Sequence, residues 1–201
     1  MRARTLVLII AVFVLGGFAI LAPYRETQAG LFAYRLSGGP FGRYYMVSPN
    51  VNPSWYSVIT VNGVNSWNNA ITWNGSHVVS FSQTSNWSNS AIDYYADEYG
   101  ANGLRAWTGW FLSNGTSAGV PPSTNWAYAE IRFNNTYMYD DIYGNLPNRS
   151  MNTAVHEFGH AIGLSHDPYV WNIMYPTIAN YDQYGIYTPQ LDDISYADAA
   201  Y

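Results

Sequence analysis

The chain has 201 residues, a formal net charge of -5, 17% aromatic residues and no cysteine. The lack of cysteine excludes a disulfide-stabilised scaffold, thiol catalysis and cysteine-based zinc sites, and the acidic balance argues against a nucleic-acid-binding surface. The aromatic content argues against disorder, and the length favours one domain with a single core.

The N-terminal segment is expected to be separate from the folded domain. Arg2 and Arg4 precede an uninterrupted apolar run over residues 6–22, and a polar stretch then leads to small residues before Gly30. This order is typical of a secretory signal peptide. We therefore expect residues 1–29 to be a signal peptide and residues 30–201 to be an exported domain. The alternative is that the apolar run remains as a membrane anchor, with the domain outside.

The first part of the domain mixes short strand patterns with one helical pattern. Short strands are predicted at Tyr44–Val47 and Val78–Phe81. A helix is predicted at Ser57–Ile71 because its apolar residues have helical spacing: Val58, Val61, Val64 and Trp67.

Three segments then have strand character to different degrees. Ala91–Tyr99 fits either a helical turn or a strand. Leu104–Leu112 is rich in aromatic residues and favours a strand. Ala127–Phe133 alternates apolar residues with Glu130 and Arg132, which predicts a half-buried strand.

The last third changes to helical patterns. Met151–Leu164 is predicted to be a helix that Ser150 caps and Gly163 ends. A final helix is predicted to begin at Thr188-Pro189, a capping residue followed by a proline, with two aspartates in the first turn. Strands and one helix followed by further helices indicate an α/β domain in which a sheet packs against helices.

The residues that carry chemistry lie at 156–166, where three of the four histidines occur in the run His-Glu-Phe-Gly-His-Ala-Ile-Gly-Leu-Ser-His. His156 and His160 are four residues apart and share one helix face. Gly163 can adopt the positive φ that ends a helix, so the chain can turn back and bring His166 to the same ion. Three imidazoles leave a fourth position open, as in catalytic zinc sites.

Glu157 is the candidate general base. Its place beside His156 suits a carboxylate that takes a proton from a zinc-bound water and then delivers it to a leaving amine. The pattern therefore predicts one catalytic Zn²⁺ and hydrolysis of peptide bonds. Calcium is conceivable elsewhere, although solvated surface carboxylates explain the acidic residues concerned: Asp97, Glu98, Asp140 and Asp141.

The motif resembles the signature of the metzincin zinc endopeptidases, HExxHxxGxxH followed by a Met-turn. Met174 matches the methionine that, in this clan, lies beneath the metal without binding it. Within the clan the chain is most similar to the matrixins, through Met174-Tyr175-Pro176 and residues 190–194. The resemblance implies an α+β zincin-like fold: a twisted, mostly parallel sheet, an active-site helix, the Met-turn and a C-terminal helix.

The resemblance also implies a substrate site. Leu104–Leu112 would be the edge strand beside the active site, along which substrate binds as an extended strand through main-chain hydrogen bonds. Tyr175 and Pro176 would form a wall of the S1′ pocket, with Val155 as a further pocket contact. Ala91–Tyr99 would begin as a strand.

Two features depart from the matrixin pattern. Asp167 follows the third histidine where matrixins usually have serine. The chain has no cysteine, and it has no acidic residue between Thr27 and Ile92, so neither a thiolate nor a carboxylate from the N-terminal segment can block the zinc. We therefore expect synthesis without a zinc-blocking propeptide.

Together these patterns predict a secreted, monomeric zinc metalloendopeptidase that acts on proteins or peptides and not on nucleic acid. Contact with a membrane is expected only if residues 6–22 are retained. The alternative is an exported module that binds carbohydrate or protein and keeps a vestigial zinc site. Composition alone favours this alternative, whereas the intact triad, Glu157 and Met174 argue against it.

Overall fold

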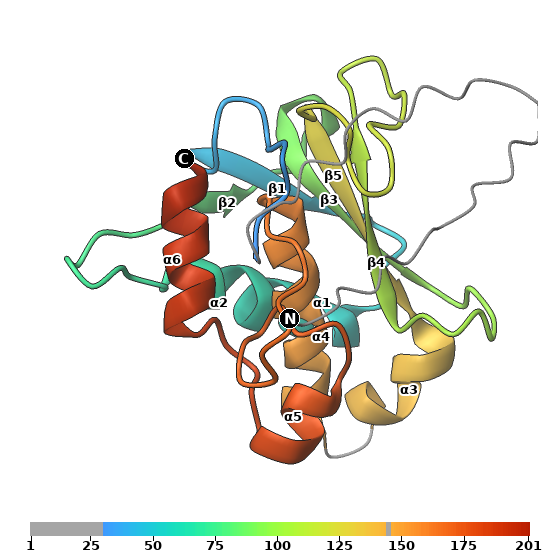
Figure 1. Ribbon diagram of the computed structural model, residues 1–201. Helices are drawn as coiled ribbons and strands as arrows, with labels where there is room; N and C mark the ends of the chain where they lie inside the picture. The colour runs from blue at the N-terminus through green and yellow to red at the C-terminus, as the bar shows by residue number, and fades with distance from the viewer. Residues whose placement is uncertain (1–29, 144–145) are drawn as a thin grey trace, which may run out of the picture.

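The computed structural model describes residues 30–143 and 146–201, so the predicted signal peptide at residues 1–29 lies outside the described part of the chain. Five strands form one mixed sheet in the order β2-β1-β3-β5-β4 (Figure 1). The strands are β1 (Arg43–Val47), β2 (Phe81–Gln83), β3 (Ser90–Asp97), β4 (Ala106–Phe111) and β5 (Tyr128–Asn134). All neighbouring pairs are parallel except β4 with β5. The antiparallel strand β4 is at one edge of the sheet.

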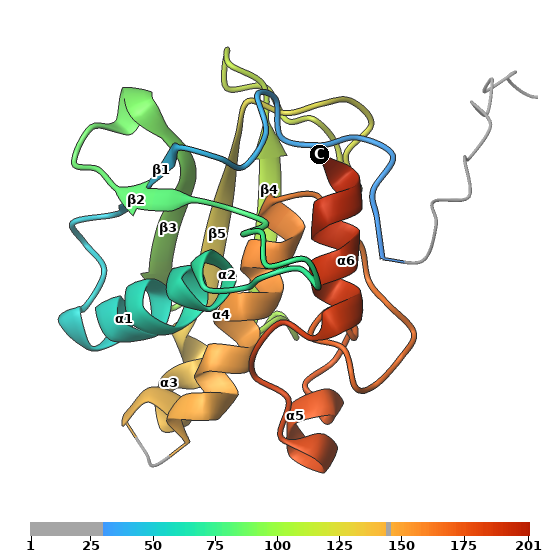
Figure 2. The same cartoon turned by 90° about the vertical axis from the view of Figure 1, so that its left-hand side faces the viewer.

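Helices pack against one face of this sheet, with α4 over β5 and β4 and α6 beside α4 (Figure 2). The α-helices are α1 (Pro53–Ser57), α2 (Asn65–Asn68), α3 (Asn135–Tyr143), α4 (Pro147–Ala161), α5 (Ala179–Tyr184) and α6 (Leu191–Ala200). A π-helical stretch, η1 (Val58–Val64), joins α1 to α2, and a short 3₁₀ turn, η2 (Trp87–Asn89), precedes β3. In the part of the chain that the structure describes, no helix is both long and apolar enough to cross a bilayer. The predicted mostly parallel sheet, active-site helix and C-terminal helix are confirmed.

The core lies between the sheet and the helices and is strongly aromatic. The predicted alternation in β5 is confirmed, because Ala129, Ile131 and Phe133 are fully buried. Phe133 stacks on Trp55 of α1 at a ring-centroid distance of 5.6 Å and on Tyr94 of β3 at 6.2 Å. These rings pack between the two layers, whereas other aromatic side chains, such as Trp73 and Trp171, are exposed.

The strand predictions hold with shifted ends. Tyr44–Val47 lies within β1, and Leu104–Leu112 contains the edge strand β4, as expected. Ala91–Tyr99 was open between helix and strand, and most of it is the strand β3. The strand expected at Val78–Phe81 instead begins at its last residue and forms β2, since it is from Phe81 onward that the backbone pairs with β1.

Three helices begin at residues other than the predicted ones, each because of its own capping residues or proline. The helix expected at Ser57–Ile71 begins at Pro53, because the Asn52 side chain accepts a hydrogen bond from the Ser54 amide at 2.9 Å and proline suits the first turn. It ends at Asn68.

The two C-terminal helices also begin at residues other than the predicted ones. The helix expected from Met151 begins at Pro147, again with proline in its first turn, so Ser150 lies inside the helix and is not its cap. The last helix begins at Leu191 and not at Thr188-Pro189, because Gln190 and Asp193 form a reciprocal capping box. Helices α3 and α5 had no counterpart among the sequence-based predictions.

Removal of the Asn52 cap is expected to destabilise the fold. Asn52→Ala leaves the Ser54 amide without its side-chain acceptor and should lower the free energy of unfolding by about 1 kcal/mol. Urea denaturation followed by circular dichroism measures this difference. Asn50→Ala, at an exposed position outside any helix, serves as the control and should change stability by less than about 0.5 kcal/mol. Equal stability of the two variants would contradict the capping role.

Candidate metal centre

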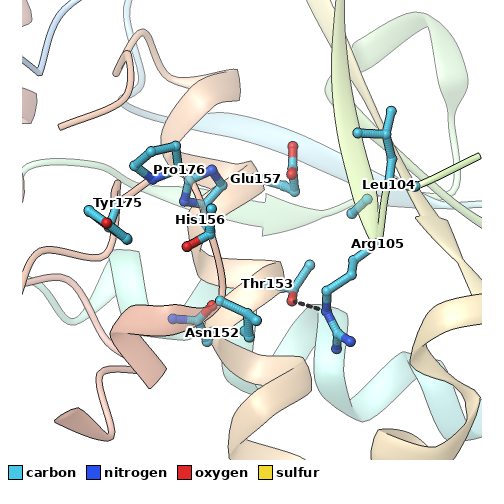
Figure 3. Close-up of a pocket in the computed structure, with 12 residues that line it drawn as sticks. Leu104, Arg105, Asn152, Thr153, His156, Glu157, Tyr175 and Pro176 are labelled. Carbon is cyan, nitrogen blue, oxygen red and sulfur yellow. Dashed lines mark hydrogen bonds between the residues drawn. The ribbon is translucent and has the colours of Figure 1, made fainter. Parts of the chain in front are cut away.

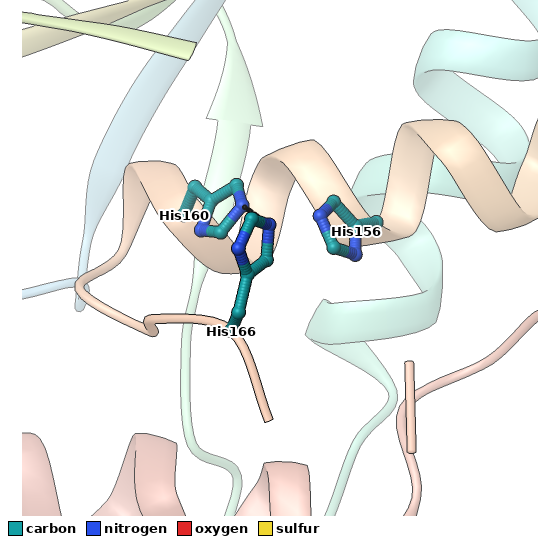
Figure 4. Close-up of side chains that lie close together, drawn as sticks. All are labelled: His156, His160 and His166. Carbon is teal, nitrogen blue, oxygen red and sulfur yellow. Dashed lines mark hydrogen bonds between the residues drawn. The ribbon is translucent and has the colours of Figure 1, made fainter. Parts of the chain in front are cut away.

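The three predicted histidine ligands lie together at the end of α4 (Figure 4). His156 and His160 project from one face of the helix, and the chain then reverses at Gly163, whose φ is 111°. This reversal brings His166 back beside them. One ring nitrogen from each of the three side chains lies within 4.8 Å of the others. Among the described residues this is the one group of three or more potential metal ligands.

The hydrogen bonds of His156 and His160 leave the Nε2 atom of each ring free to bind a metal ion. The Nδ1 atom of His156 lies 2.8 Å from the carbonyl oxygen of Ile173, and that of His160 lies 2.8 Å from the carbonyl oxygen of Leu164. Because a carbonyl oxygen can only accept, each Nδ1 carries the proton and each Nε2 keeps its lone pair. The Nε2 atoms of His160 and His166 are 3.2 Å apart.

The electrostatics of the site favour neutral imidazoles. Burial lowers the pKa of His156 to about 4 and lowers the pKa of His160 and of His166 below the ordinary value. Neutral imidazole is the form that binds a metal ion. Three neutral rings with their free nitrogens close together fit a zinc ion in both donor type and number.

Glu157 lies next to this cluster in a buried position, with 7% of its surface exposed. The hydroxyl of Thr108 on β4 donates to its Oε2 atom at 2.7 Å and also lies 3.0 Å from its carbonyl oxygen. Burial raises the pKa of Glu157 to about 7, while the hydrogen bond from Thr108 acts in the opposite direction. Sequence reasoning missed Thr108, since nothing in its local sequence indicates its distant partner.

His156 and Glu157 open into a cavity of about 290 Å³ (Figure 3). Tyr175 and Pro176, the predicted wall residues, line this cavity. Val155 is not among its lining residues: it is fully buried in the core, and its carbonyl oxygen accepts a hydrogen bond from the Trp67 indole at 2.8 Å. The remaining lining residues come from the start of β4, from α4 and from the segment before α5: Gly103, Leu104, Arg105, Ala106, Asn152, Thr153, Thr177 and Ile178.

One lining residue of this cavity, Arg105, carries a charge that is already paired. Arg105 forms an ion pair with Asp141 of α3 and donates to the carbonyl oxygen of Tyr137 at 3.1 Å. Its Nε atom also donates to the Thr153 hydroxyl at 3.4 Å. The cavity is therefore polar near Arg105 but carries little net charge. The sequence did not indicate this arrangement, because the residues involved lie far apart in the chain.

Met174 lies beneath the histidine-bearing helix. It is fully buried, and a Cβ atom placed on Gly159 would come within 2.4 Å of its sulfur. Glycine at position 159 therefore allows the close approach of Met174 to α4. The carboxylate of Asp193 on α6 accepts hydrogen bonds from the amides of Ile173 at 2.9 Å and Met174 at 3.3 Å, which ties this turn to the C-terminal helix.

Side chains from other elements satisfy the carbonyl groups at the buried end of α4. The indole of Trp110 donates to the carbonyl oxygen of His160 at 3.1 Å, and the indole of Trp126 donates to that of Ala161 at 3.1 Å. The hydroxyl of Tyr201 donates to the carbonyl oxygen of Ile162 at 2.8 Å. The last carbonyls of a helix have no intrahelical partner, so these bonds remove a desolvation cost and hold the helix in place.

Comparison with known protein families gives one match over this region. A family model described as Matrixin matches residues 69–201, which include the three histidines, Glu157 and Met174. No curated protein matches the chain.

The reversal at Gly163 is expected to be required for zinc binding. Gly163→Ala forces a side chain into a positive φ, although the nearest atoms leave room for a Cβ. The variant should unfold at lower denaturant concentration and bind zinc about tenfold more weakly, because His166 is displaced. Competition with a chromogenic chelator measures the affinity.

Gly185→Ala is the matched control for this experiment. Gly185 also has a positive φ, of 68°, and has open space around its Cβ position, but it follows α5, away from the histidines. It should lose stability without losing zinc affinity. Unchanged zinc affinity in Gly163→Ala would contradict the role of the reversal.

Proposed function

The chain belongs to the matrixin family of zinc metalloendopeptidases, and from this premise we propose how its residues cleave a peptide bond. His156, His160 and His166 hold the zinc ion, and Glu157 acts as the general base. The observation that carries the proposal is that His156 and Glu157 line one cavity, beside a cluster of neutral imidazoles.

Each residue then has a separate chemical role. Zinc, when bound, supplies Lewis-acid polarisation of the scissile carbonyl group. Glu157 accepts a proton from the attacking water and delivers it to the nitrogen of the leaving amine. The Thr108 hydroxyl restricts the Glu157 carboxylate by hydrogen bonding to Oε2, which leaves the other oxygen for this proton transfer. Met174 supports the helix from below without reacting.

The substrate is proposed to bind as an extended strand along the edge strand β4. This strand pairs with β5 on one side and ends the sheet on the other, and its inner face packs against α4. At its C-terminal end the outer edge is already paired, since the Trp110 carbonyl oxygen accepts a hydrogen bond from the Ala118 amide at 2.8 Å, so the proposed substrate contacts lie toward Ala106. Main-chain hydrogen bonds to β4 would hold the substrate, while one side chain enters the cavity beside Tyr175 and Pro176. Because Asp141 neutralises Arg105 within that cavity, we propose a preference for an uncharged side chain there.

Residues 30–201 are proposed to form the catalytic domain, exported through residues 1–29 and acting as a monomer. If residues 6–22 are not removed, the same domain would act at the outer face of a membrane.

Glu157→Gln is expected to abolish cleavage without loss of the metal. The amide keeps the size of the side chain but cannot accept the proton, so kcat/KM on an internally quenched peptide should fall by about 10²-fold or more. Zinc content, measured by mass spectrometry, should stay at the wild-type level. Glu98→Gln, at an exposed position, is the control. Full activity of Glu157→Gln would refute the mechanism, as would activity that survives removal of zinc by a chelator.

Thr108→Val tests the positioning of Glu157. Valine has nearly the same shape but no hydroxyl, so kcat should fall by about tenfold, with KM and zinc content unchanged. Thr108→Ser keeps the donor and should recover most of the activity. If both variants lose activity equally, the effect comes from packing and not from the hydrogen bond.

Cleavage of a peptide library tests the proposed cavity. Uncharged residues should dominate immediately after the cleaved bond, since Arg105 is already paired. Arg105→Met should leave Asp141 without one of its partners and shift the preference toward basic side chains. If the wild-type enzyme preferred acidic side chains at this position, the pairing of Arg105 with Asp141 could not be what sets the preference.

A further inference from the structure

A second cavity lies on the face of the sheet away from α4. Side chains alternate along a strand, so the burial of Ile92 and Tyr94 in the core turns Asp93 to the opposite face. In the register of β3 and β5, Asp93 is directly beside Glu130. The strands concerned are adjacent in Figure 1. Both carboxylates line a cavity of about 520 Å³. The residues of η2, which precedes β3 in the chain, also line it.

The two carboxylates differ in their partners. Glu130 forms an ion pair with Arg132, whose guanidinium lies 4.6 Å from the centre of the Tyr95 ring. Asp93 is only 6% exposed, and its Oδ1 atom is buried without any hydrogen-bond partner. Burial, together with the nearby charge of Glu130, raises the pKa of Asp93 to about 6, against a hydrogen bond from Ser90. A buried carboxylate of this kind lowers stability unless something pairs with it.

Two arginines, Arg43 and Arg132, lie at or near this cavity, and both guanidinium groups have other partners. Arg43 lines the cavity, but its guanidinium donates to the carbonyl oxygen of Ser37 at 3.4 Å and lies near Gly38. Arg132 is held by Glu130 and Tyr95. Neither arginine therefore serves as the partner of Asp93.

Aromatic rings form the walls of the cavity. Trp87 of η2 stacks on Tyr95 at a centroid distance of 5.9 Å and is 42% exposed. Tyr128 stacks on Phe111 at 5.2 Å and also lines the cavity. The faces of such rings attract cations, as the position of Arg132 over Tyr95 already illustrates at this surface.

We propose that this cavity binds one organic cation, a primary ammonium or guanidinium group, which pairs with Asp93 and packs against Trp87. The cavity is much larger than a single metal ion needs, and its walls combine two carboxylates with aromatic rings. A neutral ligand such as a sugar would leave the charge of Asp93 uncompensated. Two sources carry the proposed chemistry: the lysine or arginine side chain of a polypeptide, and a free polyamine.

Titration of the zinc-loaded protein with n-butylammonium and n-butylguanidinium tests the proposal, with 1-butanol as the neutral probe. Amide chemical shifts in β3 and β5 should change and saturate with the two cations but not with butanol. Asp93→Asn should weaken the binding by about tenfold or more. Asp97→Asn, an exposed position on the same strand, is the matched control and should bind as the wild type does.

Several results would overturn the proposal. These are a lack of saturable binding, equal binding of butanol, unchanged binding by Asp93→Asn, or a response to calcium chloride that replaces the response to the ammonium probes. A lysine-containing peptide and spermidine, titrated in parallel, distinguish the two sources. Peptidase activity and zinc content should be normal in Asp93→Asn, so this test is independent of the proposed catalytic mechanism.

Stability provides a second measurement on the same variant. The pKa of Asp93 is higher in the folded chain than in the unfolded chain, so the folded state holds more protons between about pH 4 and pH 6 and loses stability as the pH rises through this interval. Asp93→Asn should therefore be more stable than the wild type near pH 7.5, and the difference should shrink toward pH 4. A less stable variant at pH 7.5 would show that the fold already satisfies Asp93 and would overturn the proposal.

Discussion

The site depends on one constraint: three imidazole nitrogens must meet at a point although their residues span the end of a helix. A continuing helix would carry His166 away from His160 by about 1.5 Å for every residue. The positive φ of Gly163 ends α4 and turns the chain back, and hydrogen bonds from the Gly163 and Leu164 amides close the turn. The carbonyl of Leu164 then orients the His160 ring, so the turn that returns the third ligand also fixes the second.

Much of the remaining structure holds α4 against this turn. Indole groups of Trp67, Trp110 and Trp126 bond to carbonyl oxygens along its buried length, and Met174 packs under Gly159. A tryptophan is suited to this position because it fills the core and also donates one hydrogen bond. These three tryptophans thus serve both as core and as support for the helix that bears the metal ligands. Asp193 extends the support to α6 by accepting hydrogen bonds from the consecutive amides of Ile173 and Met174.

The sheet separates two kinds of chemistry. Its inner face directs Thr108 of β4 to Glu157, within the proposed catalytic centre. Its outer face brings Asp93 and Glu130 together beside aromatic rings, in the proposed cation site. Both arrangements follow from side-chain alternation along the strands, so a one-residue register shift would exchange the two faces and abolish both.

The sequence by itself predicted the helix-borne histidine pair, the glycine that returns His166 and the candidate base, because these depend on spacing within one short segment, whereas the role of Met174 came from the resemblance to the metzincins. It also predicted the alternation of β5 and the edge strand that contains Trp110. It misplaced the start of the first helix, where the Asn52 cap and Pro53 act together, and the starts of α4 and α6, which a first-turn proline and a capping box set. Only the tertiary structure decided the partners of α4, the pairing of Arg105 with Asp141 and the juxtaposition of Asp93 with Glu130. These contacts join residues tens of positions apart, and strand order and register, which local patterns do not encode, set which of them meet.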